Sequence, residues 1–165
     1  MTVSGVGSYE ISVFLHVAAA VVGLGATFTM ALAFPLALRM DPRHLPYVHA
    51  LSLRISQFFA LPALVVILAT GFYQVGDGDW ELGDLWLSAS LAIVVVIAIL
   101  TVAYFIPADR RLGAMAASEI EAAGPGEVTL SDAYQRAAQR EGGVGALTGA
   151  LVVIVIYLMV IKPGL

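Results

Sequence analysis

Four long apolar runs dominate the chain, and they cover residues 8–38, 51–75, 85–106 and 144–161. Each run is near or above the ~20 residues that a helix needs to cross ~30 Å of hydrocarbon. We therefore predict an all-α fold, in which four transmembrane helices run up-down-up-down in one bundle. The runs and their short links leave no room for a second domain, so residues 1–165 form a single integral membrane domain.

Polar residues gather between the third and fourth runs, over residues 108–143. We expect the third helix to continue beyond the membrane until the Gly-Pro-Gly sequence at 124–126 ends it. Ser131 is a typical N-cap for a second helix, which then runs through a flexible Gly-Gly joint at 142–143 into the fourth span. The result is a cytoplasmic helical hairpin. It serves either as a water-exposed interaction loop or as a lipid-facing amphipathic surface.

Composition and charge agree with a membrane protein. Hydrophobic residues make up 60% of the chain and the mean hydropathy is +0.93, whereas a soluble domain is ~45–50% apolar. There is no cysteine, which excludes disulfides, iron–sulfur clusters and cysteine-ligated zinc. The start of the chain lacks a basic segment, so we expect no removable signal peptide.

The basic residues are distributed unequally between the two ends of the predicted bundle. One end carries only Lys162. The positive-inside rule then places the other end in the cytoplasm and both termini outside, in a bacterial plasma membrane. That arginine-rich end carries Arg39, Arg43, Arg54, Arg110, Arg111, Arg136 and Arg140.

His16 is the most informative candidate for chemistry. It lies inside the first apolar run, where an ionisable group is costly and usually faces the bundle interior or a polar cavity. Two interpretations stay open. His16 is either a cofactor ligand or proton carrier, or a neutral histidine that is bonded to a neighbouring helix.

Lys162, the only lysine, ends the fourth run directly before Pro163. Its ammonium group snorkels to lipid phosphates, pairs with Glu10 at the same outer level, or shares one outer layer with His16. In the last case we expect a polar pocket near the external face. Trp80 and Trp86 flank the entry to the third helix and suit an interfacial aromatic belt. Residues that complete the pocket are Tyr73, Gln74, Trp86, Ser88, Ser90 and Met159.

Other motifs carry weaker signals. His44 and His49 are five residues apart and so lie on different helix faces, and we interpret both as interfacial side chains without a shared metal. The Gly145-x-x-x-Gly149 motif either seats the first helix or drives formation of a homo-oligomer. Nothing in the sequence indicates nucleic-acid binding.

The chain also resembles a group of small bacterial four-helix membrane proteins, over nearly its whole length. The closest resemblance is to an uncharacterised domain-of-unknown-function family of integral membrane proteins. That family is similar to the copper-resistance D membrane domains and the HemJ-type protoporphyrinogen oxidases. The residues that carry the resemblance are Phe14-Leu15-His16-Val17, Gly23, Gly25, Ala69-Thr70-Gly71, Leu85-Trp86-Leu87 and Met159-Val160-Ile161-Lys162-Pro163-Gly164.

This resemblance implies a haem- or porphyrin-interacting protein. In the HemJ-type enzymes, a histidine early in helix 1 and the lysine of a final Lys-Pro pair are associated with haem b, and His16 and Lys162 match those positions. The resemblance implies His16 as an axial iron ligand and Lys162 as a propionate partner or second ligand. The third run lacks His, Lys and Met, so the opposite ligand is Met159, Lys162, water or nothing.

The alternative is a non-enzymatic protein. It either transports a small solute or a metal such as copper, or serves as an accessory subunit of a membrane complex. A bundle whose polar layer only fixes helix register is a third interpretation. Whether the chain is an enzyme is not predicted.

Overall fold

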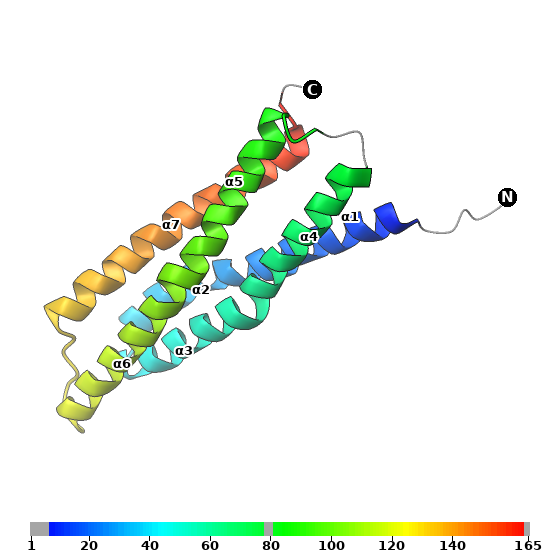
Figure 1. The fold of residues 1–165 in the computed structure, drawn as a ribbon. Coiled ribbons are helices and arrows are strands. Elements are labelled where there is room, and N and C mark those ends of the chain that lie inside the picture. Colours follow the sequence, from blue (N-terminus) through cyan, green and yellow to red (C-terminus); the bar gives the residue numbers. More distant parts are fainter. Residues whose placement is uncertain (1–6, 78–80, 164–165) are drawn as a thin grey trace.

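The computed structural model describes residues 7–77 and 81–163, and every element in this part of the chain is a helix (Figure 1). Three elements, η1, η3 and η4, are π-helical turns, and η2 is a 3₁₀ turn. In order the elements are α1 (Ser8–Ala19), η1 (Ala20–Leu24), α2 (Gly25–Arg39), η2 (Pro42–His44), α3 (Leu45–Ile55), η3 (Ser56–Ala60), α4 (Leu61–Asp77), α5 (Leu85–Leu100), η4 (Thr101–Phe105), α6 (Ile106–Ala123) and α7 (Asp132–Ile161).

These elements join into four continuous helices, each long and apolar enough to cross a membrane. They are Ser8–Arg39, Pro42–Asp77, Leu85–Ala123 and Asp132–Ile161, with 32, 36, 39 and 30 residues. The predicted all-α class and the four spans are therefore confirmed, and the helix order is consistent with up-down-up-down connection (Figure 1). At 1.5 Å per residue, even the shortest helix is about 45 Å long and extends beyond ~30 Å of hydrocarbon.

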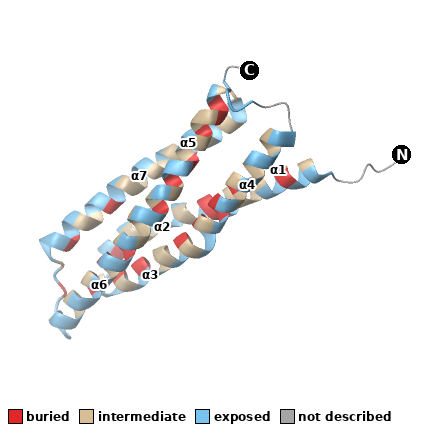
Figure 2. Ribbon diagram, viewed as in Figure 1, coloured by how far each residue is buried: buried red, intermediate tan, exposed pale blue. Residues whose placement is uncertain are grey.

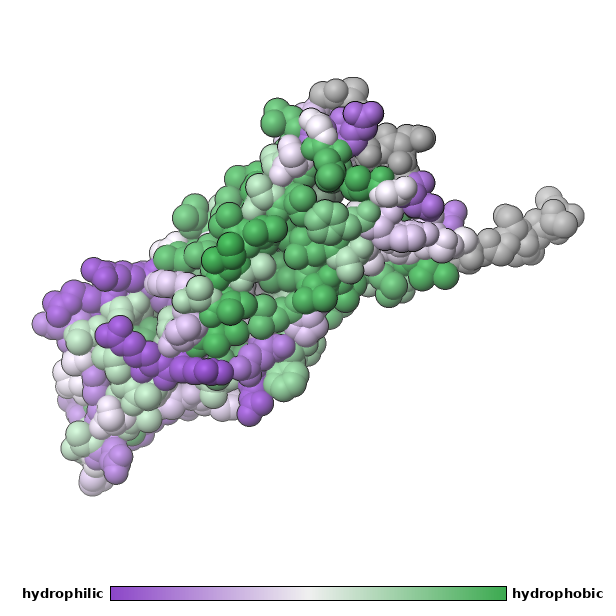
Figure 3. All heavy atoms as spheres, in the orientation of Figure 1, coloured by the Kyte–Doolittle hydropathy of each residue, from purple (hydrophilic) through white to green (hydrophobic). Residues whose placement is uncertain are grey.

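The surface is arranged for contact with lipid. A broad apolar band covers the middle of the molecule, and polar side chains gather at its ends, most of all where α6 and α7 meet (Figure 3). Large apolar side chains such as Leu32 and Val160 are 77% and 72% exposed on the outside of the bundle. The buried positions line the inward faces of the helices (Figure 2).

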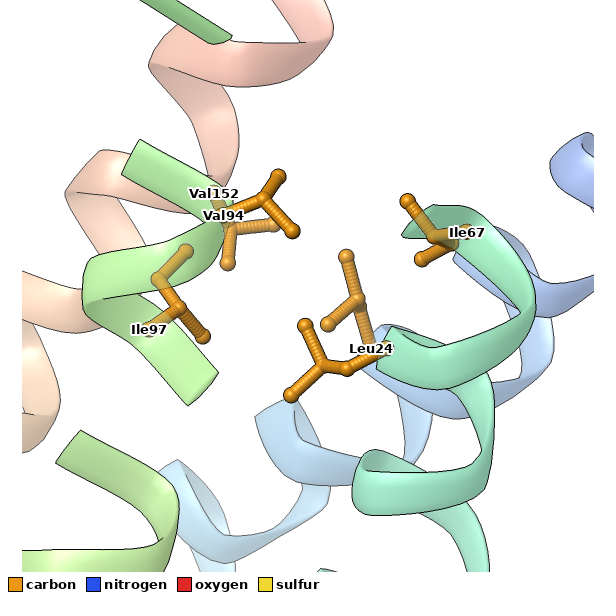
Figure 4. Packing of buried hydrophobic residues seen from close by; sticks show 6 residues of the cluster. Leu24, Ile67, Val94, Ile97 and Val152 are labelled. Atoms are coloured by element: carbon orange, nitrogen blue, oxygen red, sulfur yellow. The ribbon is translucent and has the colours of Figure 1, made fainter. Parts of the chain in front are cut away.

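An apolar cluster fills the middle of the bundle. All four long helices contribute to it, so the cluster ties the bundle together between its two polar ends (Figure 4). Its buried members are Leu24, Leu64, Ile67, Val94, Ile97 and Val152.

The polar hairpin follows its predicted signals. α6 ends where Gly124 takes a φ of +58°, a conformation that glycine adopts without strain. Ser131 caps α7, because its Oγ accepts a hydrogen bond from the Tyr134 backbone N–H at 3.2 Å. The backbone N–H and the hydroxyl of Ser131 donate to the Glu119 carboxylate at 2.9 and 2.6 Å. α7 then continues through residues 142–143 without interruption, as predicted.

Two π-helical turns come directly before prolines. η3 precedes Pro62 and η4 precedes Pro107. Proline lacks an N–H and its ring clashes with the carbonyl one turn earlier, so a wider turn there relieves the clash. Both prolines therefore lie inside continuous helices, Pro42–Asp77 and Leu85–Ala123, and the irregularity falls in the turn before each of them.

One glycine of the predicted motif in α7 contacts the first helix within the chain. A Cβ built at Gly149 would lie 3.6 Å from the Phe28 ring, whereas nothing lies within 4 Å of the corresponding point at Gly145. Gly149 thus seats the first helix, one of the two predicted roles of the motif. The homo-oligomer through Gly145 and Gly149 stays a prediction.

Gly23 in η1 allows the first two helices to approach closely. A Cβ at this position would overlap the Ala63 methyl group and lie 3.1 Å from the backbone oxygen of Phe59. We expect Gly23→Ala to lower the free energy of unfolding by about 1–3 kcal/mol, as overpacking does. The change is measured as a fall in the unfolding temperature of the detergent-solubilised protein.

Gly25→Ala is the matched control, because nothing lies within 4 Å of its Cβ position. Alanine favours the helix more than glycine, so this variant keeps or raises the unfolding temperature. An equal loss in both variants would contradict the close approach at Gly23.

Candidate functional site

His16 is bonded to the neighbouring helix. Its Nδ1 lies 2.9 Å from Oγ1 of Thr70 in α4, and the Thr70 hydroxyl donates its single proton to the Val66 carbonyl at 2.6 Å. Thr70 must therefore accept from His16 Nδ1–H, which leaves the lone pair of a neutral imidazole on Nε2. This is the hydrogen bond that the second interpretation of His16 expected, and it leaves Nε2 available as a ligand atom.

A small cavity adjoins His16. Its volume is about 40 Å³, and its lining includes His16 of α1, Gly71 of α4, Ser90 of α5 and Met159 of α7. That volume holds one or two water molecules, whereas ligand pockets are typically ~300–1,000 Å³. The cavity in this arrangement does not accommodate a porphyrin. It does bring His16 and Met159, two of the three predicted cofactor residues, to one space.

Lys162 lies at the end of α7, against Trp86. Its ammonium nitrogen is 5.4 Å from the centroid of the indole ring, a cation–π distance. Trp86 is only 5% exposed, so its predicted place in a lipid-facing belt is wrong: the end of α7 covers it. Trp80 lies outside the described residues.

Hydrogen bonds link α1 and α4 at the level of this pocket. Gln74 donates to Ser12 Oγ at 3.2 Å, and the Tyr73 hydroxyl donates to Ser8 Oγ at 2.9 Å. These predicted pocket residues therefore join two helices and do not line the cavity with His16.

The densest group of buried polar side chains lies at the arginine-rich end. His49 of α3 lies between Asp109 of α6 and Tyr134 of α7, with 3.0 Å from Nδ1 to Oδ1 and 2.9 Å from Nε2 to the phenol oxygen. The three residues are 1%, 2% and 1% exposed. The interfacial interpretation of His49 is therefore wrong, because three helices enclose the imidazole.

Close helix packing creates this burial. A Cβ at Gly113 would lie 3.2 Å from the Cβ of His49, so the glycine lets α3 approach α6. The Phe34 ring covers the imidazole from α2, with 4.9 Å between ring centroids. Four helical segments thus exclude water from His49.

Glu141 completes the group, which we name the polar cluster: His49, Asp109, Tyr134 and Glu141. Glu141 follows Tyr134 by two turns on the same face of α7 and is 8% exposed. Three ligand atoms, one each from His49, Asp109 and Glu141, all lie within 4.8 Å of one another.

The electrostatics of the polar cluster require added positive charge. Within residues 7–77 and 81–163, no lysine or arginine forms an ion pair with Asp109 or Glu141. Oδ2 of Asp109 is buried and receives no hydrogen bond from a permanent donor. Two carboxylates this close and this dry repel each other strongly. With one imidazole, either two protons or one divalent cation makes the group neutral.

The donor set fits a metal ion. Ligands about 2.0–2.1 Å from a tetrahedral ion lie about 3.3 Å apart, so the three ligand atoms, which lie within 4.8 Å of one another, would have to draw closer together to share one ion. If Nδ1 of His49 binds the ion, Nε2–H donates to the Tyr134 hydroxyl. Metal-bound histidines typically make such an outer hydrogen bond, which holds the ring in place.

Sequence reasoning missed this site because it compared His49 only with His44. His44 is exposed, as predicted, and its Nδ1 lies 2.9 Å from the Asp41 carbonyl. The available signal was the pair of acidic residues just outside the third and fourth apolar runs, Asp109 and Glu141. Carboxylates at corresponding heights on neighbouring helices meet at one end of a bundle.

Comparison with known proteins places the chain in a family. No curated protein and no solved structure matches it. A family model described as predicted integral membrane protein (DUF2269) matches residues 10–163. Because the match covers almost all of the 165 residues, the chain belongs to this family of integral membrane proteins.

Proposed function

We propose that this chain is a metal-binding integral membrane protein that holds one first-row divalent cation in the polar cluster. A single observation carries the proposal: two buried carboxyl groups and an imidazole meet, and in the described part of the chain no lysine or arginine pairs with either carboxyl group. One divalent ion with a neutral His49 balances both carboxylates.

The ligand chemistry narrows the choice of ion. An imidazole suits zinc, iron, copper and nickel, and carboxylates suit harder ions such as manganese. Cu(I) prefers sulfur ligands, and the three ligand groups contain no sulfur. Zn²⁺ accepts His, Asp and Glu together and leaves a fourth position for water.

The surroundings favour a held ion over a transported one. The apolar cluster around Leu64 fills the bundle between the polar cluster and the His16 layer, and a charged ion is strongly disfavoured in such a region. We also propose, from the positive-inside rule, that the arginine-rich end and its metal face the cytoplasm.

Calorimetric titration tests the metal site. Protein purified in detergent and dialysed against chelator binds one Zn²⁺ per chain. Loss of an outer hydrogen-bond partner weakens metal binding by roughly 10–100-fold. Asp109→Asn and Glu141→Gln each remove a charged ligand, so we expect each to weaken Zn²⁺ binding by more than that. Tyr134→Phe weakens binding within that range, because it removes only the outer partner of His49.

Glu121→Gln is the matched control, since Glu121 is exposed on α6 outside the polar cluster. It leaves the affinity for Zn²⁺ unchanged. Absence of binding heat in the wild type, or equal losses in Glu121→Gln and Glu141→Gln, would count against the site.

The metal competes with protons for the polar cluster. Charge balance implies that the metal-free cluster carries two protons, which Zn²⁺ must displace. The apparent affinity therefore rises with pH, by up to about 100-fold per unit. Titration in buffers of different ionisation enthalpy measures the protons released, and the expected number approaches two per ion. Zinc binding that is independent of pH would contradict the charge balance.

Haem binding at His16 is a second candidate function. It is favoured by the presence of His16 and Met159 around one cavity, because an imidazole and a thioether form a common axial pair for electron-transfer haems. It ranks second because the cavity is far smaller than a porphyrin. If the chain is also an accessory subunit of a membrane complex, it binds a partner protein in addition, and neither the polar cluster nor the His16 cavity is changed.

An absorption spectrum separates this second function from the first. Haem binding predicts a shifted Soret band after haem is added to the purified protein. His16→Ala abolishes the shift, and Met159→Leu changes it, because each removes one axial ligand. A spectrum equal to that of free haem in the same detergent removes the haem candidate and leaves the metal site standing.

A further inference from the structure

A second, separate feature of the arginine-rich end is a groove between α6 and α7. Its volume is about 370 Å³, within the ~300–1,000 Å³ of typical ligand sites. On each helix its lining follows the i, i+3, i+4, i+7 spacing of a single face. The charged lining residues are Arg111 of α6 and Arg136 and Arg140 of α7.

These three arginines have no side-chain partners in the described part of the chain. All three are exposed, and within residues 7–77 and 81–163 none of them forms an ion pair or a side-chain hydrogen bond. Three like charges around one groove repel one another. An anion in the groove removes that repulsion, and guanidinium groups match the geometry of phosphate oxygens.

The rest of the lining indicates where the anion comes from. Tyr104 lies in η4, at the end of the third apolar run, so one end of the groove borders the hydrocarbon. Its walls between the arginines are apolar, with Ala108, Leu112 and Ala137. A free hydrated phosphate gains nothing from such walls, whereas the glycerol and first acyl carbons of a lipid pack against them.

We propose that this groove binds the phosphate of an anionic phospholipid, with the headgroup between Arg111, Arg136 and Arg140 and the glycerol beside Tyr104. Basic pockets between membrane helices recognise lipid headgroups through the same chemistry. The site is independent of the polar cluster, because Tyr134 and Glu141 lie on a different face of α7.

Mass spectrometry of the intact protein in detergent tests the groove. The wild-type chain is titrated with phosphatidylglycerol, with phosphatidylcholine as the zwitterionic comparison. We expect one phosphatidylglycerol to bind with at least about tenfold preference. The triple variant Arg111→Gln, Arg136→Gln, Arg140→Gln loses that preference.

The matched control is Arg39→Gln, Arg54→Gln, Arg110→Gln, which removes the same charge from exposed arginines outside the groove. It retains the bound phosphatidylglycerol. Equal losses in the two triple variants, or no preference in the wild type, would overturn the proposal. So would full displacement of the lipid by millimolar inorganic phosphate, which would assign the groove to a free phosphate.

Discussion

The constraint on which the rest of this structure depends is a shortage of positive charge around two buried carboxyl groups. Asp109 and Glu141 meet beside His49, in a region from which four helical segments exclude water. Burying unpaired carboxylates costs several kcal/mol each, so the fold is stable only when protons or a cation enter with them. Whatever supplies this charge also ties α3, α6 and α7 together.

The two ends of the bundle solve the problem of polar groups in different ways. At the end opposite the arginines, neutral hydrogen bonds such as His16 to Thr70 join α1 to α4, and among the described residues there no charged side chain is buried. At the arginine-rich end, ionisable groups are buried on one face of α7 while its arginines line a groove on another. A metal and a lipid would therefore stabilise the same pair of helices through two different faces. Between the two ends the packing is apolar.

The sequence predicted the architecture because membrane spans are encoded locally. Each apolar run, the Gly124 break and the Ser131 cap depend on neighbours within one turn, so reading along the chain finds them. The polar cluster depends on pairs separated by 60 and 85 residues. Only the helix packing sets those distances. His49 looked like an interfacial residue because its partners lie on other helices.

The His16 prediction shows a second limit of sequence reasoning, which concerns cavity volume. His16 stood out as an ionisable group inside an apolar run, and the resemblance implied a cofactor role for it with Lys162 and Met159. The structure places His16 and Met159 around one cavity and Lys162 against Trp86. The residue types in the motif do not reveal cavity volume, which depends on how far Gly71 lets α1 approach α4. Close approach of this kind favours tight helix packing over a cofactor-sized space.

The central claim is that a divalent cation balances the polar cluster. Elemental analysis of the protein, purified from cells without chelator, tests it most directly. The account predicts about one equivalent of a first-row metal per chain in the wild type, and loss of that metal in Asp109→Asn while the variant remains folded. Wild-type protein that is folded and free of metal, and that takes up none from zinc-supplemented cells, would contradict the claim and leave two protons as the balancing charge.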